Sequence, residues 1–289
     1  MQRSLSHNNA VFWAAFSADG ERLATASLDN TVKLWKVSNG QLMATVKGHG
    51  DGVAFVGFLA DGRMVTASLD RTLKVWSAES NTATATMSGH QDYLACGAVA
   101  RTGQLLASGG FDKTVRLWDA GGAALATLSG HESTVQALAF STNGRILASG
   151  SDDRSIRLWD VQSKQLLRTL NGHELTVEAL AFSPKDEFLA SGSADGTVRF
   201  WNLDGGQLAT LDAGSGRIKS LAFSPDGSLI TTGGSDGTVR FWSVADRREF
   251  LVTAAHKNTV YCVTFNPTGT LLASTGFDRT IHLWSVRRN

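Results

Sequence analysis

The chain has 289 residues, of which 42% are hydrophobic and 18% are charged, and its formal net charge is +1. This length and apolar content suffice for one large domain with a sizeable core. The near-zero net charge argues against a protein whose main partners are nucleic acids or anionic membranes. No apolar run approaches the roughly 18 residues of a membrane-spanning helix, and the N-terminal sequence M-Q-R-S-L-S-H-N-N lacks the apolar core of a signal peptide. We therefore expect a soluble protein of the cytoplasm, or of the nucleus in a eukaryote.

A stretch that ends in tryptophan recurs seven times along the chain. In residues 147–159 it reads L-A-S-G-S-D-D-R-S-I-R-L-W, and successive closing tryptophans are 41 or 42 residues apart. In each copy an aspartate lies six residues before the tryptophan, and a serine or threonine lies four residues before that aspartate. A period of about 40 to 45 residues with such signatures is typical of a repeat architecture.

Each repeat divides into four strand-sized runs separated by turn residues. In the fourth repeat these runs are residues 135–140, 145–150, 155–159 and 165–170. The turn S-T-N-G between the first two ends in Gly144, where a hairpin favours a positive φ. The corresponding residue is glycine in every other repeat except the fifth, which has Asp186. No stretch shows a sustained helical period, so the chain is predicted to be all-β.

The sequence G-H, then a strand that ends in F or V, then L-A-S-x-S-x-D-x-T-V-R-L-W resembles the repeat of the WD-repeat β-propeller family. The likeness covers residues 1–289, and it implies a single domain, a seven-bladed β-propeller built from four-stranded antiparallel blades. Blades stacked around a ring cover both apolar faces of such sheets and leave only short edges. The repeats cover approximately residues 7–48, 49–89, 90–130, 131–172, 173–213, 214–255, and 256–289 together with 1–6.

The two ends of the chain predict how the ring closes. The last repeat ends at Asn289 before any fourth strand, and residues 1–5 lie where the other repeats carry their fourth strand. We therefore expect residues 1–5 to supply the outer strand of the last blade and to close the ring. The alternative is a frayed N-terminus.

Four residues of each repeat can form one chain of hydrogen bonds. The tryptophan N–H donates to the serine or threonine hydroxyl, the hydroxyl donates to a histidine, and the other histidine nitrogen donates to the aspartate. In the family that the sequence resembles, this tetrad is structural, and the resemblance implies the same role here. The tetrads, repeat by repeat, are His7, Thr25, Asp29, Trp35; His49, Thr66, Asp70, Trp76; His90, Ser108, Asp112, Trp118; His131, Ser149, Asp153, Trp159; His173, Ser191, Asp195, Trp201; Thr232, Asp236, Trp242; and His256, Ser274, Asp278, Trp284.

The sixth repeat departs from this pattern because Gly214 stands at its histidine position. Its threonine, aspartate and tryptophan then lack the imidazole that joins them. Since a buried polar group without a partner costs about 1–3 kcal/mol, we expect the sixth blade to be locally the weakest of the ring.

Catalytic and metal sites are not expected. A Ser-His-Asp triad is rejected because the serine is bonded to the tryptophan and no oxyanion loop is evident. The tetrad histidines lie in separate blades and cannot converge on one metal, and His282, where other repeats carry Lys or Arg, is interpreted as a surface substitution. Residues 213–220 lack the glycine that a phosphate loop has before its lysine. We expect no cofactor, and we expect Cys96 and Cys262, in non-neighbouring repeats, to be buried free thiols.

One rim of the ring is the predicted binding surface. In the resembling family, three positions of each repeat point into this rim: the third and fifth residues after the histidine position, and the residue before the tetrad aspartate. Repeats seven, one, two and three place aromatic or apolar residues there, and repeats four to six place charged ones. Aromatic residues and arginine dominate interface hot spots. The predicted partner-binding residues are Phe12, Leu28, Leu69, Tyr93, Phe111, Asp152, Glu178, Arg217, Lys219, Tyr261 and Phe277.

Two interpretations stay open for Phe12 and Tyr261, which either face a partner or plug the central channel. Trp13 follows Phe12 on the opposite side of the strand, so we expect it to pack between blades.

The sequence favours a non-enzymatic scaffold or adaptor, a monomeric ring that binds a peptide or a protein loop and acts alone or within a larger complex. One alternative is a regulatory or sensor domain of a larger multidomain protein. Another is a propeller that binds phosphate or nucleic acid through Arg217 and Lys219. The partner and the pathway do not follow from the sequence, because a fold does not fix a function.

Overall fold

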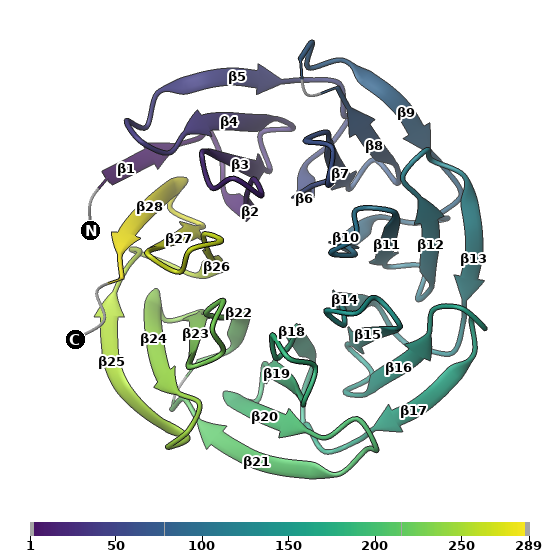
Figure 1. Cartoon of the computed structure of the whole chain (residues 1–289), viewed down its shortest axis with the longest axis vertical. Helices are drawn as coiled ribbons and strands as arrows, with labels where there is room; N and C mark the ends of the chain where they lie inside the picture. The colour runs from purple at the N-terminus through teal and green to yellow at the C-terminus, as the bar shows by residue number, and fades with distance from the viewer. Residues whose placement is uncertain (1–2, 78, 215, 287–289) are drawn as a thin grey trace.

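The structure is a computed structural model that describes residues 3–77, 79–214 and 216–286. The strands of these residues form seven antiparallel sheets of four strands each, arranged as the blades of a ring (Figure 1). The predicted all-β, seven-bladed architecture is confirmed. Within the described residues, no helix has the length and apolar character needed to cross a membrane.

The strands of each blade follow one another from the channel outward. Blade one contains β2 (Val11–Phe16), β3 (Arg22–Ser27), β4 (Val32–Lys36) and β5 (Leu42–Val46). Blade two contains β6 (Val53–Phe58), β7 (Met64–Ser68), β8 (Leu73–Trp76) and β9 (Ala83–Met87). Blade three contains β10 (Leu94–Val99), β11 (Leu105–Gly110), β12 (Val115–Asp119) and β13 (Ala124–Leu128). Blade four contains β14 (Val135–Phe140), β15 (Ile146–Ser151), β16 (Ile156–Asp160) and β17 (Leu166–Leu170).

The other three blades have the same order. Blade five contains β18 (Val177–Phe182), β19 (Leu189–Ser193), β20 (Thr197–Trp201) and β21 (Gln207–Asp212). Blade six contains β22 (Ile218–Phe223), β23 (Leu229–Gly234), β24 (Thr238–Ser243) and β25 (Arg248–Ala254). Blade seven contains β26 (Val260–Phe265), β27 (Leu271–Gly276), β28 (Thr280–Ser285) and, as its outer strand, β1 (Arg3–Ser6).

The hairpin between the first two strands of each blade forms as the turn residues predict. Gly144 has a φ of 71°, and Asp186, the one residue that is not glycine at this position, takes the same left-handed conformation with a φ of 57°. Aspartate tolerates this region better than most residues. The Asp186 carboxylate also accepts the backbone N–H groups of Thr142 (2.6 Å) and Asn143 (2.9 Å) in blade four. It therefore ties two neighbouring hairpins together.

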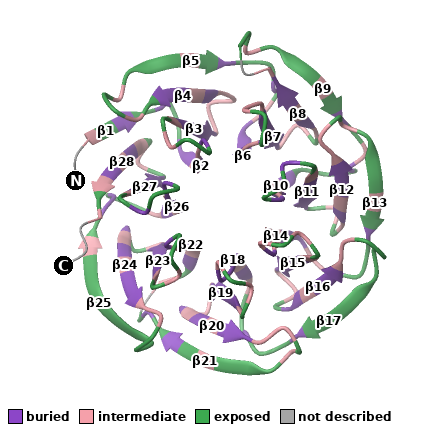
Figure 2. Cartoon of the chain, in the orientation of Figure 1, coloured by how far each residue is buried: buried purple, intermediate pink, exposed green. Residues whose placement is uncertain are grey.

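The hydrophobic core lies between neighbouring blades. Ile156 and Leu158 of blade four, for example, pack with Leu189 and Trp201 of blade five. Inner strands are mostly buried and outer strands mostly exposed, as Figure 2 shows. The approach between blades is close: a Cβ added to Gly192 would lie 2.5 Å from a methyl carbon of Ile218 in the next blade, so only glycine fits there.

The two ends of the chain meet in blade seven (Figure 1). Strand β1 pairs antiparallel with β28, in a register that runs from Arg3 opposite Leu283 to Ser6 opposite Thr280. Leu5 of this strand is buried against blade one. Closure by the N-terminal strand is thus confirmed, with residues 3–6 in place of the expected 1–5; residues 1 and 2 lie outside the described part of the chain.

Both cysteines are buried free thiols, as predicted. Cys96 lies on β10 and Cys262 on β26. Burial raises the pKa of both thiols, that of Cys262 to about 12, so both stay protonated and unreactive at neutral pH.

Removal of residues 1–6 should lower the melting temperature by about 5 °C or more, because blade seven loses its outer strand and Leu5 leaves a buried site worth roughly 2 kcal/mol. Differential scanning calorimetry of the full chain and the truncated chain measures the difference. An unchanged melting temperature would show that the ring does not depend on this strand.

Candidate functional site

The tetrad of blade four shows how each blade satisfies its buried polar groups. The Trp159 indole N–H donates to the Ser149 hydroxyl over 2.8 Å. The hydroxyl lies 2.7 Å from His131 Nε2, to which it donates, and His131 Nδ1–H donates to Asp153 over 2.8 Å. Asp153 also accepts the backbone N–H of Glu132 (3.0 Å). One carboxylate thereby joins the turn that enters the blade to the turn between its second and third strands.

The same chain of hydrogen bonds forms in all six blades that carry the histidine. The tryptophan-to-hydroxyl distance is 2.8 to 2.9 Å in these blades. The hydroxyl-to-histidine distance is 2.6 to 2.9 Å, and the histidine-to-aspartate distance is 2.7 to 3.0 Å. The residues that the repeat spacing assigns to one tetrad are therefore hydrogen-bonded to one another in the structure.

Blade six solves the loss of its histidine differently. Trp242 still donates to Thr232, at 3.1 Å the longest of the seven indole bonds. Asp236 instead accepts the guanidinium of Arg240 (2.9 Å), whose other terminal nitrogen donates to Glu249 (3.0 Å). Among the described residues nothing connects Thr232 to Asp236, so the hydrogen-bond chain is interrupted in this blade.

In the blade-four tetrad the pKa values of the histidine and of the aspartate are both lowered. Burial lowers the pKa of His131, and the adjacent Asp153 only partly offsets it. Burial alone would raise the pKa of Asp153, but hydrogen bonds from Ser155, the Glu132 backbone and His131 outweigh it and lower the pKa to about 2. A neutral imidazole beside an ionised carboxylate is thus the stable state of the folded blade.

The tetrad hydroxyls are buried and hydrogen-bonded within their blades. Ser149 is completely buried, as are Ser108, Ser191 and Ser274. Each of these hydroxyls accepts from its tryptophan and donates to its histidine. The tetrad groups are therefore bonded to one another inside the blades.

A β-bulge in the innermost strand of every blade aims one side chain at the channel mouth. In blade one the register shifts between Val11 and Trp13 and leaves Phe12 outside the ladder. The other six blades repeat the shift at the fifth residue after the histidine position. All seven of these residues line one cavity of about 210 Å³; they are Phe12, Ala54, Ala95, Gln136, Glu178, Lys219 and Tyr261. A β-bulge changes the direction of a side chain. The seven bulges together place seven side chains in a ring around this cavity.

One side of this mouth forms an apolar arc, which comprises Phe277, Tyr261, Phe12, Leu28, Leu69, Phe111 and Tyr93. Phe12 and Tyr261 are in edge-to-face contact, with ring centroids 4.9 Å apart, and both are half-buried in the cavity wall. Tyr93 and Phe111 form a second such pair at 5.9 Å. Phe277, Tyr93 and Phe111 are 51%, 47% and 44% exposed.

The opposite side forms a polar arc, which comprises Gln136, Asp152, Glu178, Arg217 and Lys219. Lys219 donates to Oε1 of Glu178 at 2.9 Å, and Arg217 Nε donates to the same oxygen at 3.0 Å. The Glu178 side chain is only 5% exposed, whereas that of Arg217 is 51% exposed. Glu178 therefore lies under the two cations, and it reaches a partner less directly than the sequence suggested.

Trp13 forms the floor of the mouth. Its ring lies 5.4 Å from that of Phe55 in blade two, so the expected contact with a neighbouring blade is present. The same side chain also lines a small cavity whose other walls include Ala137, Leu180 and Leu221 from blades four to six. The expected packing between blades is thus present, and the indole also lines a cavity shared with blades four to six.

Six of the eleven predicted rim residues, namely Phe12, Leu69, Phe111, Glu178, Lys219 and Tyr261, line the cavity together with Trp13 and Gln136. Gln136 occupies one of the expected rim positions but was not among the predicted partner-binding residues. Gln136 donates to Asp152 at 3.2 Å. Its position, the fifth after the histidine, was the available signal. The structure also corrects the interpretation of His282, which is half-buried with its ring 4.7 Å from that of His256.

Comparison with known proteins gives a consistent result. The family described as "WD domain, G-beta repeat" matches this chain seven times, at residues 1–36, 40–77, 81–119, 122–160, 164–202, 205–243 and 248–285. A human protein, WD repeat-containing protein 86, is 41% identical over 49 residues, which are 17% of this chain and 13% of that protein. The chain thus matches only a small part of this relative's length.

Acidification should destabilise the ring in two stages. Burial holds the pKa of five tetrad histidines below 6.5 in the folded state, so the unfolded chain binds more protons and stability falls as the pH drops below about 6.5. The aspartates, whose folded pKa values are also lowered, add a further loss below about pH 4. Urea unfolding between pH 7.5 and pH 5 measures the first stage.

The variant His131→Gln provides the control, because it removes one titrating imidazole. Unfolding of this variant at acidic pH should take up fewer protons than unfolding of the wild type, by up to about one proton. Its free energy of unfolding should therefore depend less steeply on pH. A wild-type stability that is constant or increases between pH 7.5 and pH 5 would contradict neutral, buried histidines.

Proposed function

The chain belongs to the WD domain, G-beta repeat family, and from this premise we propose that it is a non-enzymatic interaction platform that binds a peptide or protein loop across the rim. Propellers of this family are typically protein-interaction scaffolds. The observation that carries the proposal is the apolar arc beside a cavity of about 210 Å³.

The exposure of the apolar arc is the first support. Tyr93, Phe111 and Phe277 each expose close to half of their surface on one rim. Water is a poor solvent for such rings, and aromatic side chains that are displayed on a rigid frame bind with little loss of conformational entropy. The arc therefore offers several anchor points to one ligand.

The rigidity of the rim is the second support. In every blade one backbone hydrogen bond joins the two turns of the rim. The N–H of the residue before the tetrad aspartate donates to the carbonyl of the third residue after the histidine position. In blade three, for example, Phe111 N–H donates to the Tyr93 carbonyl over 2.9 Å. The tetrad holds the same two turns from below. A preorganised surface loses less free energy on binding.

The cavity sets the character of the ligand. Its volume accommodates one side chain of the ligand against Phe12 and Tyr261, above the Trp13 floor. On the polar side the side chain of Arg217 is 51% exposed and that of Lys219 26%, whereas Glu178 is covered at 5%. A ligand with an apolar anchor and an acidic or carbonyl group on the polar side fits this distribution best.

Two alternatives are less well supported. A phosphate or nucleic-acid site would use Arg217 and Lys219, but both cations are paired with Glu178, which lowers their attraction for a polyanion. A regulatory domain within a larger protein would use the same rim, and the sequence that flanks the propeller in its gene distinguishes it from a separate adaptor.

An affinity pull-down with the full chain tests the proposal. The triple variant Phe12→Ala, Phe111→Ala, Phe277→Ala should lose a captured protein by at least about tenfold, since hot-spot aromatics contribute 2 kcal/mol or more each. Phe250→Ala is the matched control, because Phe250 is 58% exposed on the outer strand of blade six. Capture that survives the triple variant, or that Phe250→Ala abolishes equally, would rule out the rim as the site.

A further inference from the structure

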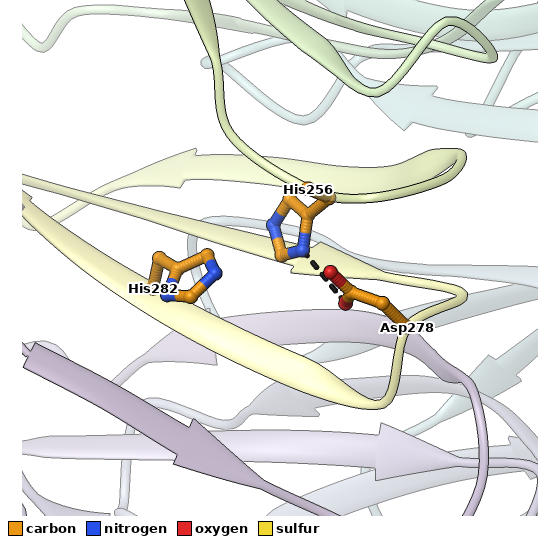
Figure 3. A group of neighbouring side chains, drawn as sticks. All are labelled: His256, Asp278 and His282. Carbon is orange, nitrogen blue, oxygen red and sulfur yellow. Dashed lines mark hydrogen bonds and ion pairs between the residues drawn. The ribbon is translucent and has the colours of Figure 1, made fainter.

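Two histidines and an aspartate converge in blade seven (Figure 3). His256 precedes β26, Asp278 lies in the turn between β27 and β28, and His282 lies on β28. Each offers one donor atom, and these three atoms lie within 4.8 Å of one another. His256 and Asp278 belong to the tetrad, whereas His282 is additional.

The other six blades lack this second imidazole. At the position of His282, two residues before the tetrad tryptophan, they carry a lysine or an arginine, namely Lys33, Lys74, Arg116, Arg157, Arg199 and Arg240. A permanent cation there repels a metal ion. A neutral imidazole at the same place instead offers a lone pair to one.

Four polar groups of this cluster lie close together. His256 Nδ1 lies 2.9 Å from an oxygen of Asp278. The Thr280 hydroxyl is 3.1 Å from His256 Nδ1 and 3.2 Å from His282 Nε2. Zinc bonds of about 2.0 Å to nitrogen and oxygen place tetrahedral ligands about 3.3 Å apart. Since the three donor atoms lie within 4.8 Å of one another, shifts of up to about 1.5 Å would bring them to this spacing.

The hydrogen bonds of His282 are incomplete without a further group. The Thr280 hydroxyl donates to Asp278 over 2.7 Å, so it can accept from His282 Nε2 but has no proton to give it. Within the described part of the chain, His282 Nδ1 is buried without a hydrogen-bond partner. Neither neutral tautomer therefore satisfies both nitrogens. In the tautomer protonated on Nδ1, the Nε2 lone pair is unused beside Thr280 and is free for an ion, while the Nδ1–H still has no acceptor among the described residues.

We propose that blade seven binds one divalent transition-metal ion, with zinc the best match, through His256 Nδ1, the Asp278 carboxylate and His282 Nε2. Two imidazoles and one carboxylate are a borderline donor set that suits zinc and does not suit magnesium or calcium. The Thr280 hydroxyl or a water completes the coordination.

The tetrad adapts to the ion by reversing one hydrogen bond. A neutral His256 that coordinates through Nδ1 carries its proton on Nε2, which then donates to Ser274 across the existing 2.9 Å. The Ser274 oxygen has two lone pairs, so it accepts this bond together with that of Trp284, and its own hydroxyl proton no longer donates to His256. The serine becomes the outer-shell partner that orients a metal-bound histidine.

The ion would strengthen the closure of the ring. His282 lies opposite Ser4 in the pairing of β28 with the closing strand β1. Coordination would fix β28 to the turn that holds Asp278 and to the segment that holds His256. The blade that joins the two ends of the chain would thus gain a cross-link that the other blades lack.

Isothermal titration of the full chain, treated with chelator and then titrated with zinc sulfate alone, tests the proposal. The wild type should bind one equivalent, and zinc at a hundredfold excess over Kd should raise the melting temperature by about 5 °C. Cobalt(II) in place of zinc should give the visible absorption of a tetrahedral N/O site.

His282→Arg restores the residue type of the other blades and should weaken zinc binding by at least about tenfold. His282→Gln serves the same purpose if the arginine variant does not fold. His131→Gln, in a blade with a tetrad alone, should bind zinc as the wild type does. The proposal is wrong if the wild type shows no saturable binding, or if the His282 variants bind zinc with unchanged affinity.

Discussion

A buried indole N–H must find an acceptor, and this requirement organises every blade. The tryptophan packs between blades, where water cannot reach its nitrogen, so its N–H donates to a hydroxyl. The hydroxyl is hydrogen-bonded to an imidazole and the imidazole to a carboxylate, which also accepts the backbone N–H groups of a turn. In blade four this path runs from Trp159 to Asp153 through Ser149 and His131. A core contact is thereby linked to the position of two surface turns.

This arrangement separates stability from recognition. The tetrad residues are nearly uniform in type from blade to blade and are occupied by one another, so they carry little information for a partner. The rim residues differ from blade to blade: Phe12 and Tyr261 face Glu178 and Lys219 across the same cavity. A fixed frame with variable residues at its mouth is consistent with the proposed interaction platform.

The sequence predicted the ring, the strands and the tetrads because each depends on offsets within one repeat. What it did not predict depends on contacts between repeats or on a local irregularity. The bulge at Phe12 leaves that residue outside the ladder, and Trp13 lines a cavity shared with blades four to six. Arg217 covers Glu178 from the next blade, 39 residues away. The prediction that His282 lies on the surface was wrong because its burial depends on its contact with His256, which its own residue type does not indicate.

Native-state hydrogen exchange of individual amides, compared between blades six and four, tests most directly whether the tetrads hold the blades. Blade six keeps its tryptophan and its packing but lacks the link between Thr232 and Asp236. The account predicts faster exchange in β22 to β24 than in β14 to β16 under the same conditions. Equal protection in the two blades would show that packing alone holds them and that the hydrogen-bond chain is incidental.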